Sequence, residues 1–225
     1  MVPPQALEIV HADAVCAVID KPAGLRSVPA RGADEDPAKR DSVETRARAT
    51  FDRPTIPVIV HRLDLETSGL MVIGLTRDAH RRLSIQFMKR KVGKTYAALL
   101  DGAVESDEGA VDLPLAVDWP NRPRQRVDTT HGRASRTLYR VTARETRPFG
   151  PVTRVAFRTE TGRTHQIRVH SATARDLGGL GTPILGDSLY GDASRASRLM
   201  LHADMLAFWH PAEHTWVKFA SPAPF

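Results

Sequence analysis

The residues with the clearest chemical potential lie in the segment HRLDLETSG at 61–69, directly before an apolar run. Asp64 follows Arg62 by two positions, and small polar residues come shortly after it. A carboxylate close to an apolar wall must be paired or hydrogen-bonded, or it takes up a proton. The pattern therefore indicates a carboxylate held as an anion, the form that acts as a nucleophile. The same residues also fit a polar turn with a structural Arg–Asp ion pair, so this segment alone leaves both interpretations open.

The composition limits the class of protein. Of the 225 residues, 41% are hydrophobic and 26% are charged, which is typical of a globular protein with one large domain or two small ones. No apolar run approaches the roughly 20 residues of a membrane-spanning helix, and the first residues lack the pattern of a signal peptide. Cys16 is the only cysteine, so no disulfide can form within the chain. We expect a reducing, cytoplasmic location and no membrane partner.

Positive charge is concentrated in two segments. The net charge is +6, and residues 77–94 contain seven Lys or Arg and a single Asp. Residues 121–140 contain six Arg and a single Asp. Two basic segments in one chain favour a polyanionic partner such as nucleic acid. A solvated surface that is merely rich in arginine is the alternative.

The hydrophobic patterns predict more strands than helices, with short turns between many of them. This is typical of an α+β fold with a largely antiparallel sheet. Thr76 is the expected N-cap of the second helix, and Thr164 that of the third. The predicted strands are a pair within 6–20, then 70–75, 94–100, 136–143, 152–160, 184–191 (short), 201–211 and 215–220. The predicted helices are 42–50, 77–91 and a segment from Thr164 through His170 to Arg175.

Five further strings complete a recognisable pattern. They are KPAGL at 21–25, GKTYAALLDG at 93–102, TGRTHQIRVH at 161–170, PILGDSLYG at 183–191 and LHADMLAFWHP at 201–211. In this order, and together with HRLDLETSG, they resemble the RluA family of pseudouridine synthases over essentially the whole chain. The resemblance implies an isomerase that converts specific uridines in RNA to their C-glycoside isomer. It also implies a single catalytic domain at 1–225, with a mixed, mostly antiparallel bent sheet flanked by helices and loops.

The resemblance assigns catalytic roles to three residues. Asp64 is the carboxylate that attacks the sugar or the base, or that assists glycal formation. Arg168 matches the arginine that pairs with it, and a guanidinium within ~4–6 Å would lower the pKa of the aspartate by ~1–3 units. Tyr96 matches the active-site tyrosine, whose ring can stack on an everted uracil. The alternatives are a phosphate contact for Arg168 and a core position for Tyr96. Isomerisation involves no net oxidation or hydrolysis, so we expect no cofactor and no metal.

Several basic residues are candidates for contact with RNA. Arg62 could fill the gap left by the everted base, and His61 is expected to position the same turn, although either could instead bind phosphate. Asp187 and Tyr190 are interpreted as a structural turn beneath the site. The histidines at 165, 170, 202 and 210 lack the spacing of a helical zinc site. The predicted RNA-binding residues are His61, Arg62, Arg81, Arg82, Arg124, Arg163 and His165.

The chain departs from the family pattern in two places. KPAGL begins at residue 21, so no S4-like domain is expected before it, and loops 31–41 and 121–135 should recognise the substrate. SATARDLGGLGT at 171–182 is longer than the usual connection, and its role is open. Residues 111–139 resemble the branch that modifies large-subunit rRNA and a tRNA anticodon stem-loop. A monomer is expected. A non-catalytic RNA-binding protein or RNA chaperone, and a metal-dependent nuclease, are the competing hypotheses.

Overall fold

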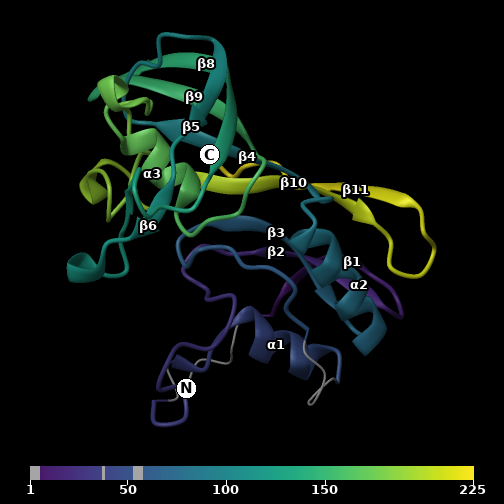
Figure 1. Ribbon diagram of the computed structural model, residues 1–225. Coiled ribbons are helices and arrows are strands. Elements are labelled where there is room, and N and C mark those ends of the chain that lie inside the picture. Colours follow the sequence, from purple (N-terminus) through teal and green to yellow (C-terminus); the bar gives the residue numbers. More distant parts are fainter. Residues whose placement is uncertain (1–5, 37–38, 53–57) are drawn as a thin grey trace. The chain divides into compact units, whose positions relative to one another are not determined.

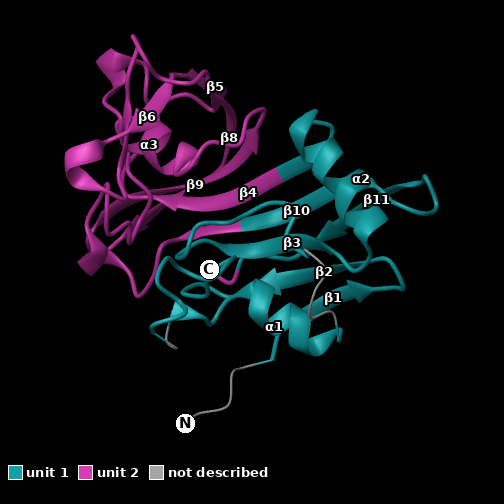
Figure 2. Ribbon diagram, turned by 60° about the horizontal axis from the view of Figure 1, so that its bottom comes forward, with its two compact units in different colours: residues 1–94, 203–223 teal, residues 95–202, 224–225 magenta. Residues whose placement is uncertain are grey.

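The computed structural model describes residues 6–36, 39–52 and 58–225. Its contacts group the chain into two compact units, coloured teal and magenta in Figure 2. Unit 1 comprises Met1–Lys94 and Ala203–Ala223, and unit 2 comprises Thr95–His202 and Pro224–Phe225. The single catalytic domain expected at 1–225 stays a prediction. In the part of the chain that the structure describes, no helix is long and apolar enough to cross a membrane.

The strands form a sheet with the hydrogen-bonded order β1-β2-β3-β10-β4-β9-β8-β5 (Figure 1). β11 pairs with β10, and β6 pairs separately with β7. The strand pairs β1–β2, β2–β3, β4–β9, β5–β8, β6–β7, β8–β9 and β10–β11 are all antiparallel. This confirms the predicted α+β fold with a mostly antiparallel sheet. The strands are β1 (Glu8–Ala12), β2 (Cys16–Lys21), β3 (Ser68–Gly74), β4 (Gly93–Leu100), β5 (Glu108–Asp112), β6 (Leu115–Val117), β7 (Gln125–Val127), β8 (Arg136–Arg147), β9 (Gly150–Thr159), β10 (Leu201–Trp209) and β11 (Trp216–Ala220). The α-helices are α1 (Val43–Thr50), α2 (Arg77–Met88) and α3 (Gln166–Ala172).

In unit 1, α2 packs against an apolar core that includes residues of β2, β3 and β10. Leu83 of α2 is fully buried in this core together with Val72 and Phe208. The predicted N-cap is confirmed, since the Thr76 hydroxyl accepts the N–H of Ala79 at 3.1 Å. The helix ends at Met88 rather than near residue 91, because the chain then turns into a left-handed conformation with φ +55° at residue 90.

Gly69 allows the backbone of β3 to approach β10 closely. Its φ is +116°, and an added Cβ would lie 2.4 Å from the carbonyl oxygen of Ala203. Any other residue would strain the backbone and collide with the neighbouring main chain. The packing of β3 against β10 therefore requires glycine at position 69.

Unit 2 has its own core, formed by β4 and β9 and covered by α3. Val155 and Phe157 of β9 are buried against Ala98 of β4 and Ile167 of α3. The alternation predicted for this strand is confirmed, since Arg154 and Arg158 lie on its less buried face.

Several expectations for unit 2 were wrong or incomplete. The strand expected at 184–191 does not form, since these residues are mostly in turns apart from a single β-bridge between Ile184 and Leu100. The N-cap of α3 is His165, which has a left-handed φ of +53° and makes no side-chain capping bond, so Thr164 is not the cap. The helix ends at Ala172, three residues before the predicted end. The pattern also missed β5, β6 and β7, of which the last two have three residues each. Strands this short contain too little alternation to be recognised.

Candidate active site and RNA-binding residues

Asp64 lies in unit 1, on a tight turn directly before β3. Its side chain is half-buried, and its backbone carbonyl accepts the N–H of Thr67 at 3.2 Å. Leu63 on one side is buried, whereas Arg62 before it is exposed. The turn thus presents a carboxylate that is partly open to solvent, next to an exposed guanidinium.

The turn is held on the N-terminal side of Asp64 by Ser27. The Ser27 hydroxyl donates to the carbonyl of Leu63 at 2.7 Å and accepts the N–H of the same residue at 3.0 Å. Both partners are buried, so the two bonds satisfy main-chain groups that water cannot reach. Sequence reasoning missed this role, because 36 residues separate the serine from the leucine.

On the C-terminal side of Asp64, the turn is held by the KPAGL segment. The ammonium group of Lys21 is fully buried and donates to three carbonyls, those of Pro22, Leu25 and Leu65, at 2.8–3.1 Å. The N–H of Gly24 donates to the same Leu65 carbonyl at 2.9 Å. Both neighbours of Asp64 in sequence are therefore anchored. The signal that could have revealed this is a lysine at the end of a buried strand, since a buried ammonium group needs such partners.

Replacing Ser27 with alanine is expected to lower both stability and turnover. The buried N–H and C=O of Leu63 lose their partner, which costs about 1–3 kcal/mol of unfolding free energy. Because Leu63 adjoins Asp64, the carboxylate is less well positioned, and we expect kcat to fall roughly tenfold. Tritium release from C5-labelled uridine in RNA measures turnover, and urea unfolding measures stability. Ser84→Ala on α2 is the control, and an unchanged kcat in a folded Ser27→Ala protein would contradict the positioning role.

His61 packs inside unit 1 as a neutral side chain. Its ring stacks on Phe87 with 4.2 Å between centroids, and its Nε2 accepts the N–H of Val72 at 3.1 Å. An accepting Nε2 places the ring proton on Nδ1. Burial, helped by the charge of Lys94, lowers the pKa of His61 from 6.5 to about 3. This geometry favours the positioning role over a charged phosphate contact.

The depressed pKa of His61 predicts a pH-dependent stability. The unfolded chain binds this proton below about pH 6.5, whereas the folded chain binds it only near pH 3. The free energy of unfolding should therefore be highest above pH 6.5 and should fall with decreasing pH, by up to about 1.4 kcal/mol per unit from this residue. Urea unfolding at several pH values measures the slope. His61→Gln should flatten it, and the same slope in His61→Gln as in the exposed control His131→Gln would refute the assignment.

The other two candidate arginines of unit 1 lie on α2 and share one acidic partner. Arg81 and Arg82 bind the carboxylate of Asp78 at 2.9 and 2.6 Å. Arg82 also lies 3.2 Å from the ring nitrogen of His214. Asp78 thus offsets part of the positive charge expected on this helix.

Arg168 lies in unit 2 and is held by a bidentate ion pair. Its Nε and Nη2 donate to the two carboxylate oxygens of Asp187 at 2.8 and 2.7 Å. Arg168 is only 2% exposed, which does not favour the alternative of a phosphate contact. Its predicted pairing with Asp64 stays a prediction.

Asp187 does more than form the structural turn that we predicted. Besides Arg168, it accepts the N–H groups of Leu189 and Tyr190 at 2.9 and 3.0 Å. Burial raises the pKa of Asp187, but these bonds and the guanidinium outweigh it, so the pKa lies below its usual 3.8. No local pattern could have revealed the pair, because 19 residues separate the two side chains.

Three of the predicted site residues meet around Tyr190. Nδ1 of His165 lies 2.8 Å from the Tyr190 hydroxyl, which also accepts the N–H of Gln125 at 2.7 Å. The guanidinium groups of Arg124 and Arg168 lie 5.2 and 5.4 Å from the centre of the Tyr190 ring. Arg124 is exposed, whereas His165 and Arg168 are buried. The tyrosine therefore connects a buried, ordered network to an exposed basic side chain.

The remaining candidates of unit 2 lie on its strands and turns. Arg163 is half-buried, and its Nε donates to the carbonyl of Ala134 at 3.1 Å. Tyr96 lies on β4 opposite Phe157 of β9, and its ring is half-buried against the core of unit 2. This position is compatible with both interpretations of the tyrosine.

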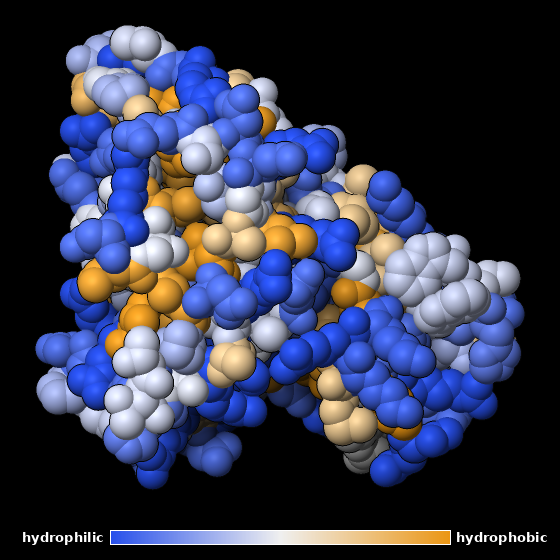
Figure 3. Space-filling view, turned by 45° about the horizontal axis from the view of Figure 1, so that its top comes forward, coloured by the Kyte–Doolittle hydropathy of each residue, from blue (hydrophilic) through white to orange (hydrophobic). Residues whose placement is uncertain are grey.

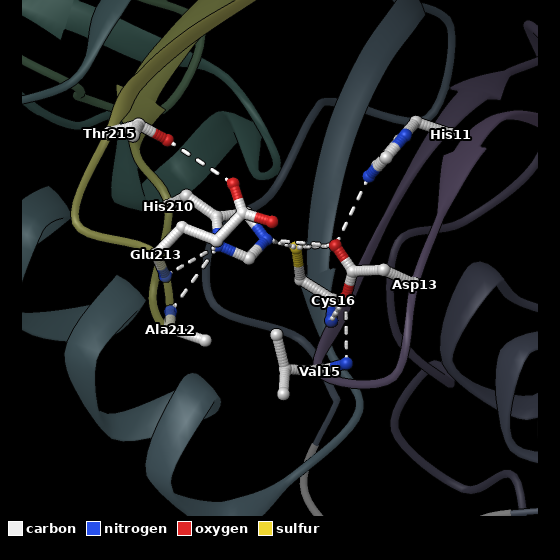
Figure 4. Close-up of polar contacts among 8 residues, drawn as sticks. All are labelled: His11, Asp13, Val15, Cys16, His210, Ala212, Glu213 and Thr215. Atoms are coloured by element: carbon white, nitrogen blue, oxygen red, sulfur yellow. Dashed lines mark hydrogen bonds and ion pairs between the residues drawn. The ribbon is translucent and has the colours of Figure 1, made fainter.

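A second polar cluster in unit 1 has the residue types of a metal site (Figure 4). Within the described residues, Asp13, Cys16 and His210 form the group that could hold an ion. Nε2 of His210 lies 2.8 Å from Oδ2 of Asp13 and 3.6 Å from the Cys16 sulfur. Its other nitrogen, Nδ1, accepts the N–H of Glu213 at 3.0 Å, so the ring proton lies on Nε2 and is donated to Asp13.

This arrangement does not fit a metal ion well. A metal at Nε2 would require the opposite tautomer of His210, with Nδ1–H facing a backbone N–H. It would also require a thiolate, whereas burial and the neighbouring Asp13 raise the pKa of Cys16 to about 12. We interpret the cluster as hydrogen bonds that join the turn before β2 to the turn between β10 and β11.

Comparisons with known proteins agree with the resemblance. A family model described as RNA pseudouridylate synthase matches residues 15–173. The chain is 42% identical over 220 residues to the dual-specificity RNA pseudouridine synthase RluA of Yersinia pestis, covering 96% of this chain and 99% of the relative. The protein of the same name from Escherichia coli strain K12 is 41% identical over 228 residues, or 99% of this chain and 97% of the relative. The solved structure of human RNA pseudouridylate synthase domain containing 1 superposes with a TM-score of 0.76 at 27% identity, covering 100% of this chain and 87% of that one. The chain therefore belongs to the RNA pseudouridine synthase family.

Proposed function

We propose that this RNA pseudouridine synthase modifies two kinds of RNA, large-subunit rRNA and a tRNA anticodon stem-loop. The observation that carries the proposal is the 41–42% identity, over nearly the whole chain, to relatives described as dual-specificity enzymes. The stretch 111–139, which resembles the branch that modifies both RNAs, lies within this match. The proposal also takes the protein to be a monomer that acts on RNA in the cytoplasm.

The proposed chemistry assigns one role to each of three side chains. Asp64 is the carboxylate that reacts with the sugar or the base, or that assists glycal formation. Arg168 is the guanidinium that pairs with this carboxylate, and Tyr96 stacks on the everted uracil. The anchored turn around Asp64 and the ion pair that orients Arg168 support these roles, because catalytic groups act only when they are held in position.

The loop before β7 is the proposed RNA contact of unit 2. Trp119 is 68% exposed, and the guanidinium carbon of Arg122 lies 3.4 Å from the centre of its ring. Arg124 is exposed beside Tyr190. An aromatic ring next to exposed guanidinium groups suits an unpaired base with its phosphate.

The basic segment 121–140 is less positive than its composition suggests. Three of its arginines have acidic partners within 4.0 Å: Arg126 with Asp128, Arg136 with Asp112, and Arg140 with Glu108. Arg122 and Arg124 are therefore the stronger candidates for phosphate contact. In the other expected recognition loop, 31–41, residues 37–38 lie outside the described residues.

RNA affinity is expected to depend strongly on salt. If about six phosphates are contacted, the logarithm of the association constant should fall with the logarithm of salt concentration with a slope of about −4 to −5. Filter binding of an rRNA fragment at several salt concentrations measures this slope. Replacing Arg122 and Arg124 together with alanine should reduce its magnitude, whereas Arg136→Ala should change it little. A flat salt dependence would contradict phosphate contacts as the main source of affinity.

Pseudouridine mapping of total RNA tests the proposed substrates. A strain that lacks the gene should lose specific pseudouridines in rRNA and tRNA, and the wild-type gene should restore them. Restoration in only one class of RNA would overturn the dual specificity. Restoration by a gene that encodes Asp64→Asn would overturn the proposed chemistry.

A further inference from the structure

The hairpin of β10 and β11 has two exposed tryptophans on its outer face. Trp209 and Trp216 are paired in register, and each side chain is 49% exposed. Their rings meet edge to face with 5.7 Å between centroids. The alternate residues of β11, such as Phe219, point the other way and pack in the core of unit 1. Large aromatic side chains left this open on an ordered strand indicate a binding surface.

The position of Trp209 is fixed by α2. The side-chain amide of Gln86 donates to the Trp209 carbonyl at 2.8 Å, and its oxygen accepts the Trp209 N–H at 2.9 Å. The backbone carbonyl of Gln86 accepts the N–H of Lys91 at 2.9 Å. One glutamine therefore joins the hairpin to the segment that follows the helix. Figure 2 shows α2 beside β10 and β11 within the teal unit.

Three consecutive basic residues, Lys89, Arg90 and Lys91, lie next to the tryptophans. All three are exposed, and none has an acidic partner among the residues that the structure describes. Gly93 follows Lys91 by two residues, and a Cβ added to Gly93 would lie 3.8 Å from the Trp216 ring. At most about 7 Å of backbone therefore separates Lys91 from this contact. This distinguishes the run from Arg81 and Arg82 earlier on the helix, which share a carboxylate.

A fourth cation lies on the aromatic face itself. Lys218 is exposed and two residues after Trp216, so both side chains project from the same side of β11. Hydrophilic residues are plentiful on the molecular face in Figure 3, with hydrophobic ones gathered in patches between them. The combination of an aromatic pair with exposed cations is what single-stranded nucleic acid requires, because bases stack while phosphates pair with the charges.

We propose that an unpaired stretch of the RNA substrate binds this surface, which we call the tryptophan surface: Trp209, Trp216, the basic run 89–91 and Lys218. Its bases stack on the two rings, and its phosphates contact the lysines and the arginine. The proposal rests on RNA as the substrate, and it extends the RNA contact beyond the catalytic motifs. A second copy of this chain fits less well, because two identical basic runs would repel each other.

Tryptophan fluorescence tests the proposal directly. The chain has three tryptophans, so Trp119→Phe leaves Trp209 and Trp216 as the reporters. The probe is a ten-nucleotide oligoadenylate, which contains no uridine and is not a substrate. We expect saturable quenching at low salt. Lys89→Ala with Lys91→Ala should weaken binding by roughly tenfold, in proportion to the lost phosphate contacts. Trp216→Ala should also weaken it roughly tenfold, and Trp216→Phe much less.

A matched double variant controls for loss of charge alone. Arg46→Ala with Arg48→Ala removes two cations from α1 that already pair with acids, and it should not change the quenching. No quenching, or equal weakening by both double variants, would overturn the proposal. Quenching by anionic lipid vesicles but not by oligoadenylate would assign the surface to membranes instead. Self-association that Trp216→Ala abolishes would assign it to a second copy. Isomerase activity of the unmodified protein on RNA is measured separately. A protein that isomerises uridine in RNA but does not bind oligoadenylate would refute the tryptophan surface and leave the substrate assignment intact.

Discussion

Asp64→Asn is expected to abolish isomerisation while RNA binding is retained. We expect kcat to fall by at least about 10³-fold, because asparagine preserves the shape of the side chain but has no negative charge with which to react. RNA affinity should change little, since the proposed phosphate contacts lie on other residues. Tritium release from C5-labelled uridine in RNA measures turnover, and filter binding of the same RNA measures affinity.

Glu66→Gln is the matched control for Asp64→Asn. It removes an equal charge two residues away in the same turn, and this side chain is also half-buried. We expect its kcat to stay close to that of the unmodified enzyme. Turnover that survives in Asp64→Asn would reject the carboxylate as the reacting group. Loss of turnover in both variants would mean that the charge of the turn matters rather than Asp64 itself.

Features that depend on local chemistry could be predicted from the sequence. The start of α2 is one example, because a threonine hydroxyl that accepts the N–H three residues later is a local event. The buried strand after Asp64 is another, because it contains the apolar run from Leu70 to Ile73. The catalytic assignments came instead from the resemblance to a family, and the identity to relatives supports the family rather than each role.

Features created by tertiary contacts could not be predicted. Ser27 and Lys21 hold the turn of Asp64 from 36 and 44 residues away. The left-handed conformation of His165 replaced the cap expected at Thr164. Histidine is enriched in this conformation, but the conformation is rare for any residue other than glycine, so a single histidine in the sequence does not predict it. The two tryptophans of the hairpin are likewise seven positions apart in sequence, and only the register of β10 and β11 places them opposite each other.

Asp187→Asn is expected to destabilise the protein and to inactivate what remains folded. Removing the charge leaves the Arg168 guanidinium buried without its counter-ion, which costs about 3–5 kcal/mol of unfolding free energy. Urea unfolding measures this cost. Asp101→Asn is the control, since its partner Arg195 is 30% exposed and such a pair contributes about 1 kcal/mol or less. Equal costs for the two variants would contradict a special role for the buried pair.

The pH dependence provides a second test of the same ion pair. The pKa of Asp187 is below its usual 3.8 in the folded protein, so the unfolded chain takes up this proton first as the pH falls. The stabilisation by the pair is therefore complete above about pH 5 and is lost as the pH falls through 3.8 towards the lower folded value. The difference in unfolding free energy between the unmodified protein and Asp187→Asn should shrink over that range. A constant difference would show that the charge of Asp187 is not what stabilises the fold.

A double variant separates stability from chemistry if Asp187→Asn does not fold. Arg168→Met combined with Asp187→Leu removes both charges, and apolar replacement of a buried ion pair is often neutral or stabilising. We expect this protein to unfold at a urea concentration closer to that of the unmodified enzyme, yet to have no detectable turnover. Recovery of turnover together with stability would mean that Arg168 is only a structural residue. Recovery of stability alone would support the guanidinium as a member of the active site, held in place by Asp187.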